Sequence, residues 1–265
     1  MDLDDLLHAV RNHPDTVTIP EDWTQGRACY GGLMAGLLYE AMRLQISPER
    51  KVRSLAITFV APAQADVPIT FAIETLREGK GVSSLLGRAV QNGQVVTMMQ
   101  GSFGAPRASA VALTNRPAAE MLDLEAATEL PFISGVTPQY IRHLAIRWGV
   151  GAMPFTGTPS PAMGGWMRLR NEAGPQPLSE AHLLVLVDAW PPALLPHLTA
   201  PAPGSSLTWT IEFVHPAPPL TTLDWCRYCA VIEHARDGYG HTAAGVWSAS
   251  GELLAISRQT VTVFA

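Results

Sequence analysis

The chain carries an internal repeat, and this repeat limits its possible folds more than any other feature. The segment Phe59–Ala63 (FVAPA) returns as Phe213–Ala217 (FVHPA), and Gln94–Gln100 (QVVTMMQ) returns as Leu253–Gln259 (LLAISRQ). The copies occur in the same order with similar spacing, which indicates a duplicated structural unit. The chain is therefore expected to fold as two halves with the same architecture.

Each half is predicted to consist of an apolar helix followed by an antiparallel sheet. Turn residues such as Asn92-Gly93 separate the strand-like runs, and such tight turns join antiparallel strands. One sheet alone leaves open edges and an uncovered helix face, whereas two copies can pair edge to edge and bury both helices. The predicted class is α+β.

The predicted boundaries follow from these patterns. The halves are expected at 1–105 and 138–265, with 106–137 as the connection between them. The predicted helices are 2–11, 33–44, 117–128 and 179–197. The predicted strands are 52–62, 68–76, 83–91 and 94–103 in the first half, and 139–148, 165–169, 206–215, 223–233, 240–248 and 252–263 in the second.

The helix of the second half contains one carboxylate, Asp188. From His182 to Trp190 the apolar residues fall on every side of the helix, which is typical of a helix enclosed by other structure. The run is too short to cross a bilayer. A buried carboxylate is unfavourable unless it has a partner, so Asp188 is a functional candidate. The alternative is that Asp188 reaches the helix edge and contacts solvent or a backbone amide.

Composition limits the classes of partner. The chain is 47% hydrophobic and 15% charged, as expected of a compact globular protein. Its net charge is -5 and its 18 basic residues are scattered, so nucleic acid is not an expected partner. The first residues lack a signal-peptide pattern and no run is long enough for a membrane span. We expect a cytoplasmic protein.

The three cysteines do not predict a metal site. Cys226 and Cys229 have C-x-x-C spacing, but they lie in a predicted strand, and no second pair of ligands stands nearby. Together with Cys29 they form an odd, small set, which argues against a disulfide framework. No metal is expected.

Several segments resemble the acyl-CoA thioesterase II family. They are 74–103, Tyr30-Gly31-Gly32 before the first helix, Trp166-Met167-Arg168, and the pattern from Asp188 to His197. The resemblance implies a double hotdog fold, in which two curved antiparallel sheets each wrap a central helix. It also implies hydrolysis of acyl-CoA in fatty-acid metabolism without a cofactor, and it favours an assembly of identical chains, although a monomer stays open.

The resemblance also implies the catalytic residues. The family holds a water with an Asp on the second helix, a Ser or Thr on the next strand and a Gln on the last strand. The matching positions are Asp188, Ser206 and Gln259, with Thr208 as an alternative hydroxyl because residues two apart on a strand share a face. The family often has Asp-His where this chain has Thr208-Trp209, which marks a shorter, divergent branch.

The first half supplies candidates for substrate binding. By the repeat, Glu40 corresponds to Asp188 and Gln100 corresponds to Gln259. We favour a degenerate copy that keeps part of the binding cleft, with a second active site as the alternative. The glycines of Tyr30-Gly31-Gly32 allow a substrate to approach backbone amides closely.

The sequence lacks the motifs of several other enzyme classes. The chain lacks the Gly-x-Ser-x-Gly elbow and the phosphate-binding glycine loops. Two alternatives to a thioesterase stay open. One is an acyl-CoA-binding protein without activity, and the other is an enoyl-CoA hydratase or dehydratase, which would need an Asp-His pair. The sequence does not define the acyl chain length.

Overall fold

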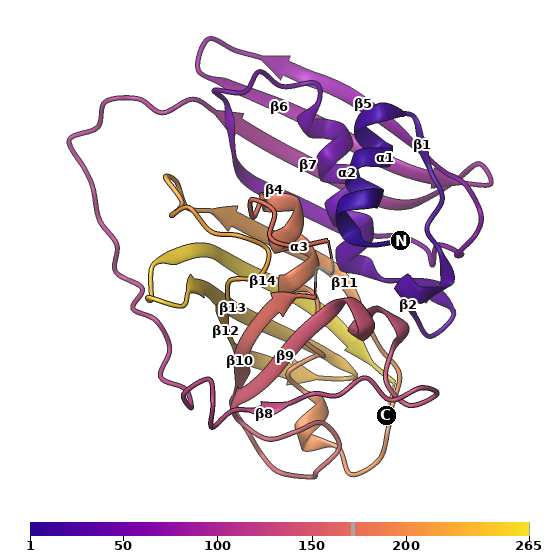
Figure 1. The fold of residues 1–265 in the computed structure, drawn as a ribbon, viewed down its shortest axis with the longest axis vertical. Helices are drawn as coiled ribbons and strands as arrows, with labels where there is room; N and C mark the ends of the chain where they lie inside the picture. The colour runs from indigo at the N-terminus through magenta and orange to yellow at the C-terminus, as the bar shows by residue number, and fades with distance from the viewer. Residues whose placement is uncertain (171–172, 265) are drawn as a thin grey trace. The chain divides into compact units, whose positions relative to one another are not determined.

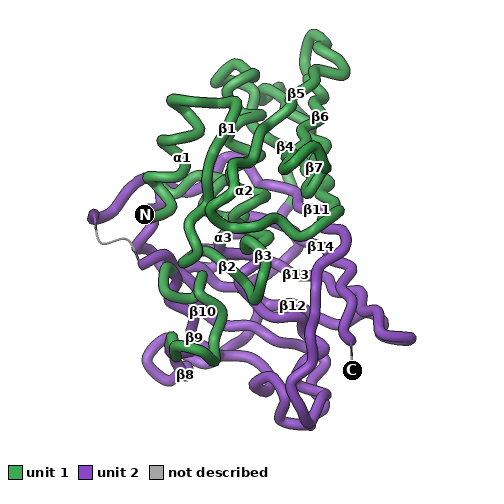
Figure 2. The backbone as a smooth tube through the Cα atoms, turned by 90° about the vertical axis from the view of Figure 1, so that its right-hand side faces the viewer, with its two compact units in different colours: residues 1–113, 132–143, 178–185 green, residues 114–131, 144–177, 186–265 purple. Residues whose placement is uncertain are grey.

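The computed structural model describes residues 1–170 and 173–264. The chain divides into two compact units, and each is discontinuous in sequence (Figure 2). Unit 1 consists of Met1–Leu113, Phe132–His143 and Leu178–Val185. Unit 2 consists of Thr114–Pro131, Leu144–Pro177 and Leu186–Ala265.

The sheet of unit 1 is antiparallel and confirms the predicted strands of the first half. Its order is β1 (Thr16–Val17), β5 (Ile69–Glu78), β6 (Val82–Gln91), β7 (Gln94–Gly104) and β4 (Lys51–Phe59). Asn92 and Gly93 both have positive φ at the β6–β7 turn, as a tight hairpin requires. Strand β4 pairs with β7, so only β5, β6 and β7 form a meander.

Two helices belong to unit 1. Helix α1 (Leu3–Asn12) begins with a capping box between Asp2 and Asp5 and buries its apolar side. Helix α2 (Gly31–Arg43) packs on β5, β6 and β7, and Figure 1 shows it across the face of these strands. Unit 1 also contains the short elements η1 (Glu21–Trp23), β2 (Thr24–Gln25), β3 (Ala28–Cys29) and η2 (Gln139–His143).

The sheet of unit 2 repeats the strand order of unit 1. Its order is β11 (Gly204–Phe213), β14 (Leu253–Val263), β13 (Tyr239–Ser248), β12 (Cys226–Arg236), β10 (Ala162–Leu169), β9 (Leu144–Val150) and β8 (Thr128–Glu129). The run β11-β14-β13-β12 has the same connectivity as β4-β7-β6-β5, and all of these pairs are antiparallel. The predicted duplication is confirmed at the level of topology.

Helix α3 (Glu180–Val187) is much shorter than the predicted helix over 179–197. Asp188 and Ala189 form a turn directly after it, and a short 3-10 helix, η3 (Leu195–His197), follows. The prediction is wrong because Pro191 and Pro192 lack the N–H that a continuing helix needs. The residues of α3 from Ala181 to Val187 are all buried, as the apolar pattern predicts.

Two other local predictions are wrong. Residues 117–128 form no helix, and the connection after β7 follows an extended path in Figure 1. It is largely exposed, so a short helix there would lack the packing that usually stabilises one. The predicted strand over 139–148 begins as the 3-10 helix η2 and becomes strand β9 only at Leu144.

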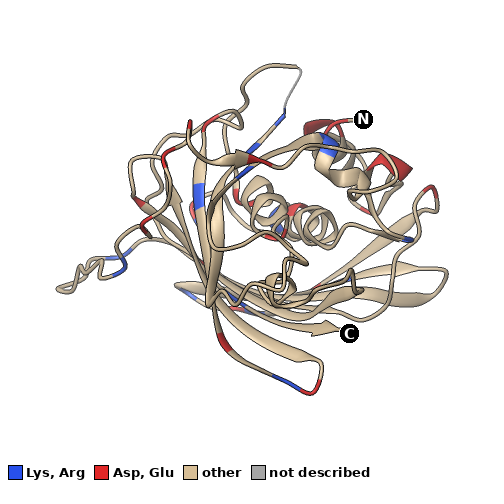
Figure 3. Ribbon diagram, turned by 90° about the horizontal axis from the view of Figure 1, so that it is seen from below, with Lys and Arg blue, Asp and Glu red and all other residues tan. Residues whose placement is uncertain are grey.

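The described residues add further detail on charge and cysteines. Figure 3 shows Lys and Arg dispersed, without a basic cluster in that view. The three cysteines are free and buried, and burial raises the pKa of Cys226 to about 12.

Within 1–170 and 173–264, no group of three His, Cys, Asp or Glu could hold a metal ion. Among the same residues, no helix is long and apolar enough to span a membrane.

Candidate active site

Asp188 and Gln259 meet in unit 2 although 71 residues separate them. Asp188 is the first residue after α3, and Gln259 lies near the middle of β14. The Nε2–H group of Gln259 donates a hydrogen bond of 2.8 Å to Oδ1 of Asp188. Both residues are half-buried, so this polar pair lies between the core and a solvent-accessible space.

The register of the sheet explains why Gln259 faces inward. Gln259 is paired with Trp209 on β11, and paired residues of antiparallel strands point to the same face. Trp209 is fully buried, and its Nε1–H donates a 2.8 Å hydrogen bond to Oγ of Ser257. Ser257 and Gln259 are two residues apart on one strand, so they share this inner face.

A β-bulge separates the two candidate hydroxyls. Ser206 pairs with Val261, whereas Thr208 pairs with Thr260, and the register shifts between them. Val261 and Thr260 are consecutive and face opposite sides of the sheet, so Ser206 and Thr208 do too. The expectation that both hydroxyls share a face is therefore wrong. Ser206 lies on the face of Gln259, and Thr208 is exposed on the other face.

Tyr228 is a neighbour of Asp188 that sequence reasoning missed. It lies on β12, is 5% exposed, and its ring stacks on Trp190 at a centroid distance of 5.3 Å. Burial raises the pKa of the Tyr228 phenol, and the negative charge of Asp188 raises it further. Trp190 also contacts Trp148. These aromatic rings form an apolar wall close to the carboxylate, and nothing in the local pattern of β12 indicated it.

In unit 1, Glu40 already has a partner. It is 6% exposed, and Nε of Arg11 on α1 donates a 2.5 Å hydrogen bond to its Oε1. This ion pair joins α1 to α2, so the carboxylate that the repeat predicts as the counterpart of Asp188 serves a structural contact. Its predicted part in substrate binding gains no support from this geometry.

Gln100 does not correspond to Gln259, so this prediction is wrong. Gln100 is exposed on the outer face of β7. The repeat aligns Phe59 with Phe213, and hence Leu55 with Trp209. Leu55 pairs with Gly101, as Trp209 pairs with Gln259. The topological counterpart of Gln259 is therefore Gly101, which has no side chain.

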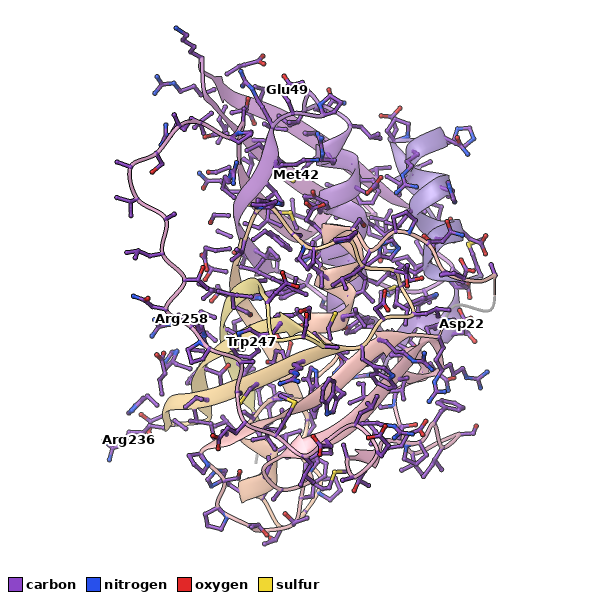
Figure 4. The ribbon with its side chains drawn as sticks, turned by 60° about the vertical axis from the view of Figure 1, so that its left-hand side comes forward. Asp22, Met42, Glu49, Arg236, Trp247 and Arg258 are labelled. Atoms are coloured by element: carbon purple, nitrogen blue, oxygen red, sulfur yellow. The ribbon has the colours of Figure 1, made fainter. Side chains whose placement is uncertain are left out.

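Apolar side chains fill the space next to Gly101. A Cβ atom there would lie 2.7 Å from Cε2 of Phe103, 3.0 Å from Cε of Met42 and 3.1 Å from Cδ2 of Leu55. Figure 4 labels Met42, which comes from α2. The inner face of the first half thus has packed hydrocarbon where the second half has an amide. Unit 1 does not reproduce the Asp188–Gln259 pair.

The segment Tyr30-Gly31-Gly32 forms the start of α2. Tyr30 is fully buried, its hydroxyl donates a 2.6 Å hydrogen bond to the carbonyl oxygen of Val185 in α3, and its ring stacks on Tyr140 at 3.9 Å. Gly31 and Gly32 lie in the first turn, and no side chain caps it. Tyr30 therefore holds parts of unit 1 together, and substrate binding by this segment stays a prediction.

Comparison with family models assigns both halves of the chain. The model of the acyl-CoA thioesterase C-terminal domain matches residues 123–263, and that of the N-terminal domain matches residues 19–104. The chain belongs to the acyl-CoA thioesterase family. An acyl-CoA thioesterase 2 from Haemophilus influenzae is 35% identical over 82 residues, a match that covers 30% of this chain and 28% of that protein.

Solved structures of similar fold support the architecture. A conserved hotdog-fold protein from Alicyclobacillus acidocaldarius has a TM-score of 0.81 and 23% identity, over 94% of this chain and 92% of its own. The tesB protein of Mycobacterium avium subs paratuberculosis has a TM-score of 0.77 and 15% identity, over 100% of both chains. These likenesses confirm the predicted double hotdog fold of this acyl-CoA thioesterase family member.

Proposed function

We propose that the chain hydrolyses acyl-CoA thioesters to a free acid and CoA. The observation that carries this proposal is the 2.8 Å hydrogen bond from Gln259 to Asp188, because it pairs a carboxylate with an orienting amide on one inner face. Membership of the acyl-CoA thioesterase family supports the same reaction. The expected assembly of identical chains remains a prediction.

The pair has the groups that hold and activate a water molecule. Gln259 uses an N–H to bind Asp188, which leaves its carbonyl oxygen as an acceptor. A water that donates one hydrogen to this oxygen and the other to Asp188 directs its lone pair away from both. The N–H donated by Gln259 favours the ionised carboxylate, which is the form that accepts a proton.

The reaction then follows ordinary acyl-transfer chemistry. The water oxygen forms a bond to the thioester carbonyl carbon as Asp188 accepts the proton. When the tetrahedral intermediate collapses, the C–S bond breaks and its electron pair leaves with the CoA thiolate, which then takes a proton. Ser206 lies on the same face as Gln259 and can donate a further hydrogen bond to the water or to the carbonyl oxygen.

Measurement of free-thiol release from a panel of acyl-CoA substrates tests the proposal. Asp188→Asn keeps the shape and an oxygen for Gln259 but cannot act as a base, so kcat is expected to fall about 100-fold or more. Glu212→Gln is the matched control, because Glu212 is a half-buried carboxylate on β11 outside the proposed site. Its kcat is expected to stay unchanged.

The two alternative functions, acyl-CoA binding without activity and hydration of enoyl-CoA, predict other outcomes in these assays. A non-catalytic binding protein would bind acyl-CoA without release of thiol from any substrate, and that outcome would refute the proposal. A hydratase would add water to crotonyl-CoA and remove its ultraviolet absorbance. Equal activity of wild type and Asp188→Asn, with the fold intact by circular dichroism, would remove Asp188 from the mechanism.

A further inference from the structure

Unit 2 contains a groove beside the turn between β12 and β13. Its volume is about 380 Å³, which lies within the range of small-molecule sites. Six of the residues that line it are apolar or aromatic, namely Leu194, Leu198, Ile232, Ala235, Tyr239 and Val263. We refer to this cavity as the hairpin groove. Nothing in the proposed chemistry of Asp188 and Gln259 uses it.

The sheet register connects the hairpin groove to Gln259. Thr242 pairs with Gln259 on one side and with Ile232 on the other, so the three residues form one row across the strands. Ile232 therefore lies two strands from Gln259, about 10 Å away on the same face. Val263, at the other end of the groove, lies four residues beyond Gln259 on β14, or about 13 Å.

Leu194 covers the space between these two ends. Gly240 on β13 pairs with Val261, which also pairs with Ser206. A Cβ atom at Gly240 would lie 2.3 Å from Cδ1 of Leu194, so the leucine rests directly on the backbone of this residue. Only glycine allows this approach. The Leu194 side chain thus stands between the row of Gln259 and the far end of the groove.

We propose that the hairpin groove receives the alkyl end of the acyl chain, and that Leu194 on Gly240 limits how far the chain enters. This inference rests on the proposed thioesterase function and adds its chain-length preference. An alkyl chain whose thioester lies at Gln259 meets Ile232 at a distance of about 10 Å, and Leu194 stands before Val263, which lies at about 13 Å. Medium and long acyl chains span these distances, and short ones do not.

The polar residues at the groove fit a neutral ligand better than the phosphates of CoA. Arg236 and Asp237 carry opposite charges at the tip of the hairpin, and Figure 4 shows Arg236 extending outward there. Nε2 of His197 donates a 3.0 Å hydrogen bond to the carbonyl oxygen of Ser160. A site for several phosphates would need an excess of cationic donors, whereas this groove offers mainly hydrocarbon.

The test is a chain-length series of acyl-CoA substrates from butyryl to dodecanoyl. Each methylene that enters the groove is expected to raise kcat/KM roughly fourfold, until the groove is full. Ile232→Trp fills the groove about 10 Å from Gln259, so kcat/KM for decanoyl-CoA is expected to fall at least tenfold, with butyryl-CoA within twofold of wild type. Leu194→Ala is expected to move the optimum toward longer chains.

Val231→Trp provides the matched control. Val231 is the neighbour of Ile232 on β12, is 44% exposed and faces the other side of the strand, so its series should equal that of wild type. If Ile232→Trp and Leu194→Ala leave the ratio of long-chain to short-chain kcat/KM unchanged, even where both values fall, the inference is overturned.

A binding measurement separates this inference from the proposed function. S-decyl-CoA, a thioether that cannot be hydrolysed, is titrated into wild type and Ile232→Trp by calorimetry. Affinity at least tenfold weaker in the variant supports the groove even if no substrate is hydrolysed. Equal affinity in both proteins overturns the groove even if hydrolysis is found.

Discussion

Gln259→Glu is the sharpest perturbation of the proposed site, because it changes one donor into an acceptor with almost no change in shape. Gln259 places its Nε2 atom 2.8 Å from Oδ1 of Asp188. A glutamate would set a second carboxylate oxygen at that distance. Two carboxylates so close cannot both be ionised, and they share one proton.

The size of the effect follows from the charge separation. Two unit charges about 4 Å apart near a protein surface repel by about 4 kcal/mol, which corresponds to roughly three pKa units. The upper pKa of the pair would then lie near 7, about three units above that of an ordinary carboxyl group. We expect the acid limb of kcat/KM to move up by about three pH units, with a loss of about twofold at pH 7, tenfold at pH 6 and 100-fold at pH 5, and with full activity near pH 9.

The assay is the pH profile of kcat/KM by free-thiol release, together with a thermal melt to check the fold. The control is Gln100→Glu, which makes the same change on the exposed face of β7 and should leave the profile unchanged. If the acid limb of Gln259→Glu coincides with that of wild type, Asp188 is not the base and the reasoning fails.

Three further results are expected. Ser206→Ala should lower kcat about tenfold, which corresponds to the loss of one hydrogen bond. Thr208→Val should leave kcat unchanged, and equal losses in the two variants would contradict the placement of Ser206 and Thr208 on opposite faces. Arg11→Met leaves Glu40 without its partner, so urea unfolding should show a loss of about 1–3 kcal/mol with kcat intact. Burial raises the pKa of Cys226 to about 12 in the folded state. The thiol therefore contributes fully to the free energy of unfolding below pH 9, and this contribution is lost as the pH rises from 9 to about 12. Cys226→Ala should therefore flatten the alkaline loss of unfolding free energy by up to about 1.4 kcal/mol per pH unit, and an identical slope would contradict this burial.

The sequence predicted the elements that depend on local pattern. The strands of both halves except the first part of 139–148, their duplication and the buried character of the segment before Asp188 all follow from apolar periodicity and turn residues. The end of α3 also has a local signal, because Pro191 and Pro192 break the helix, although the predicted range extends past them to 197.

The predictions that failed depend on strand pairing. Alignment of the two repeat segments matched Gln100 with Gln259, but the strand register shows that Gly101 occupies the equivalent position. A shift of one residue along a strand moves a side chain to the other face of the sheet. The bulge between Ser206 and Thr208 has the same effect. Neither feature has a local signal, since both are set by the partner strand. The Tyr228 ring and the hairpin groove likewise arise from tertiary packing.

The packing around Gly101 has an evolutionary consequence. To build a Glu–Gln pair in unit 1, Gly101 would have to gain a side chain, Met42 and Phe103 would have to be replaced by smaller residues, and Arg11 would have to release Glu40. Each change alone produces a steric clash, a cavity or an unpaired buried charge. The effects of these substitutions therefore depend on one another, and a single substitution cannot build a second pair in unit 1 without a loss of stability.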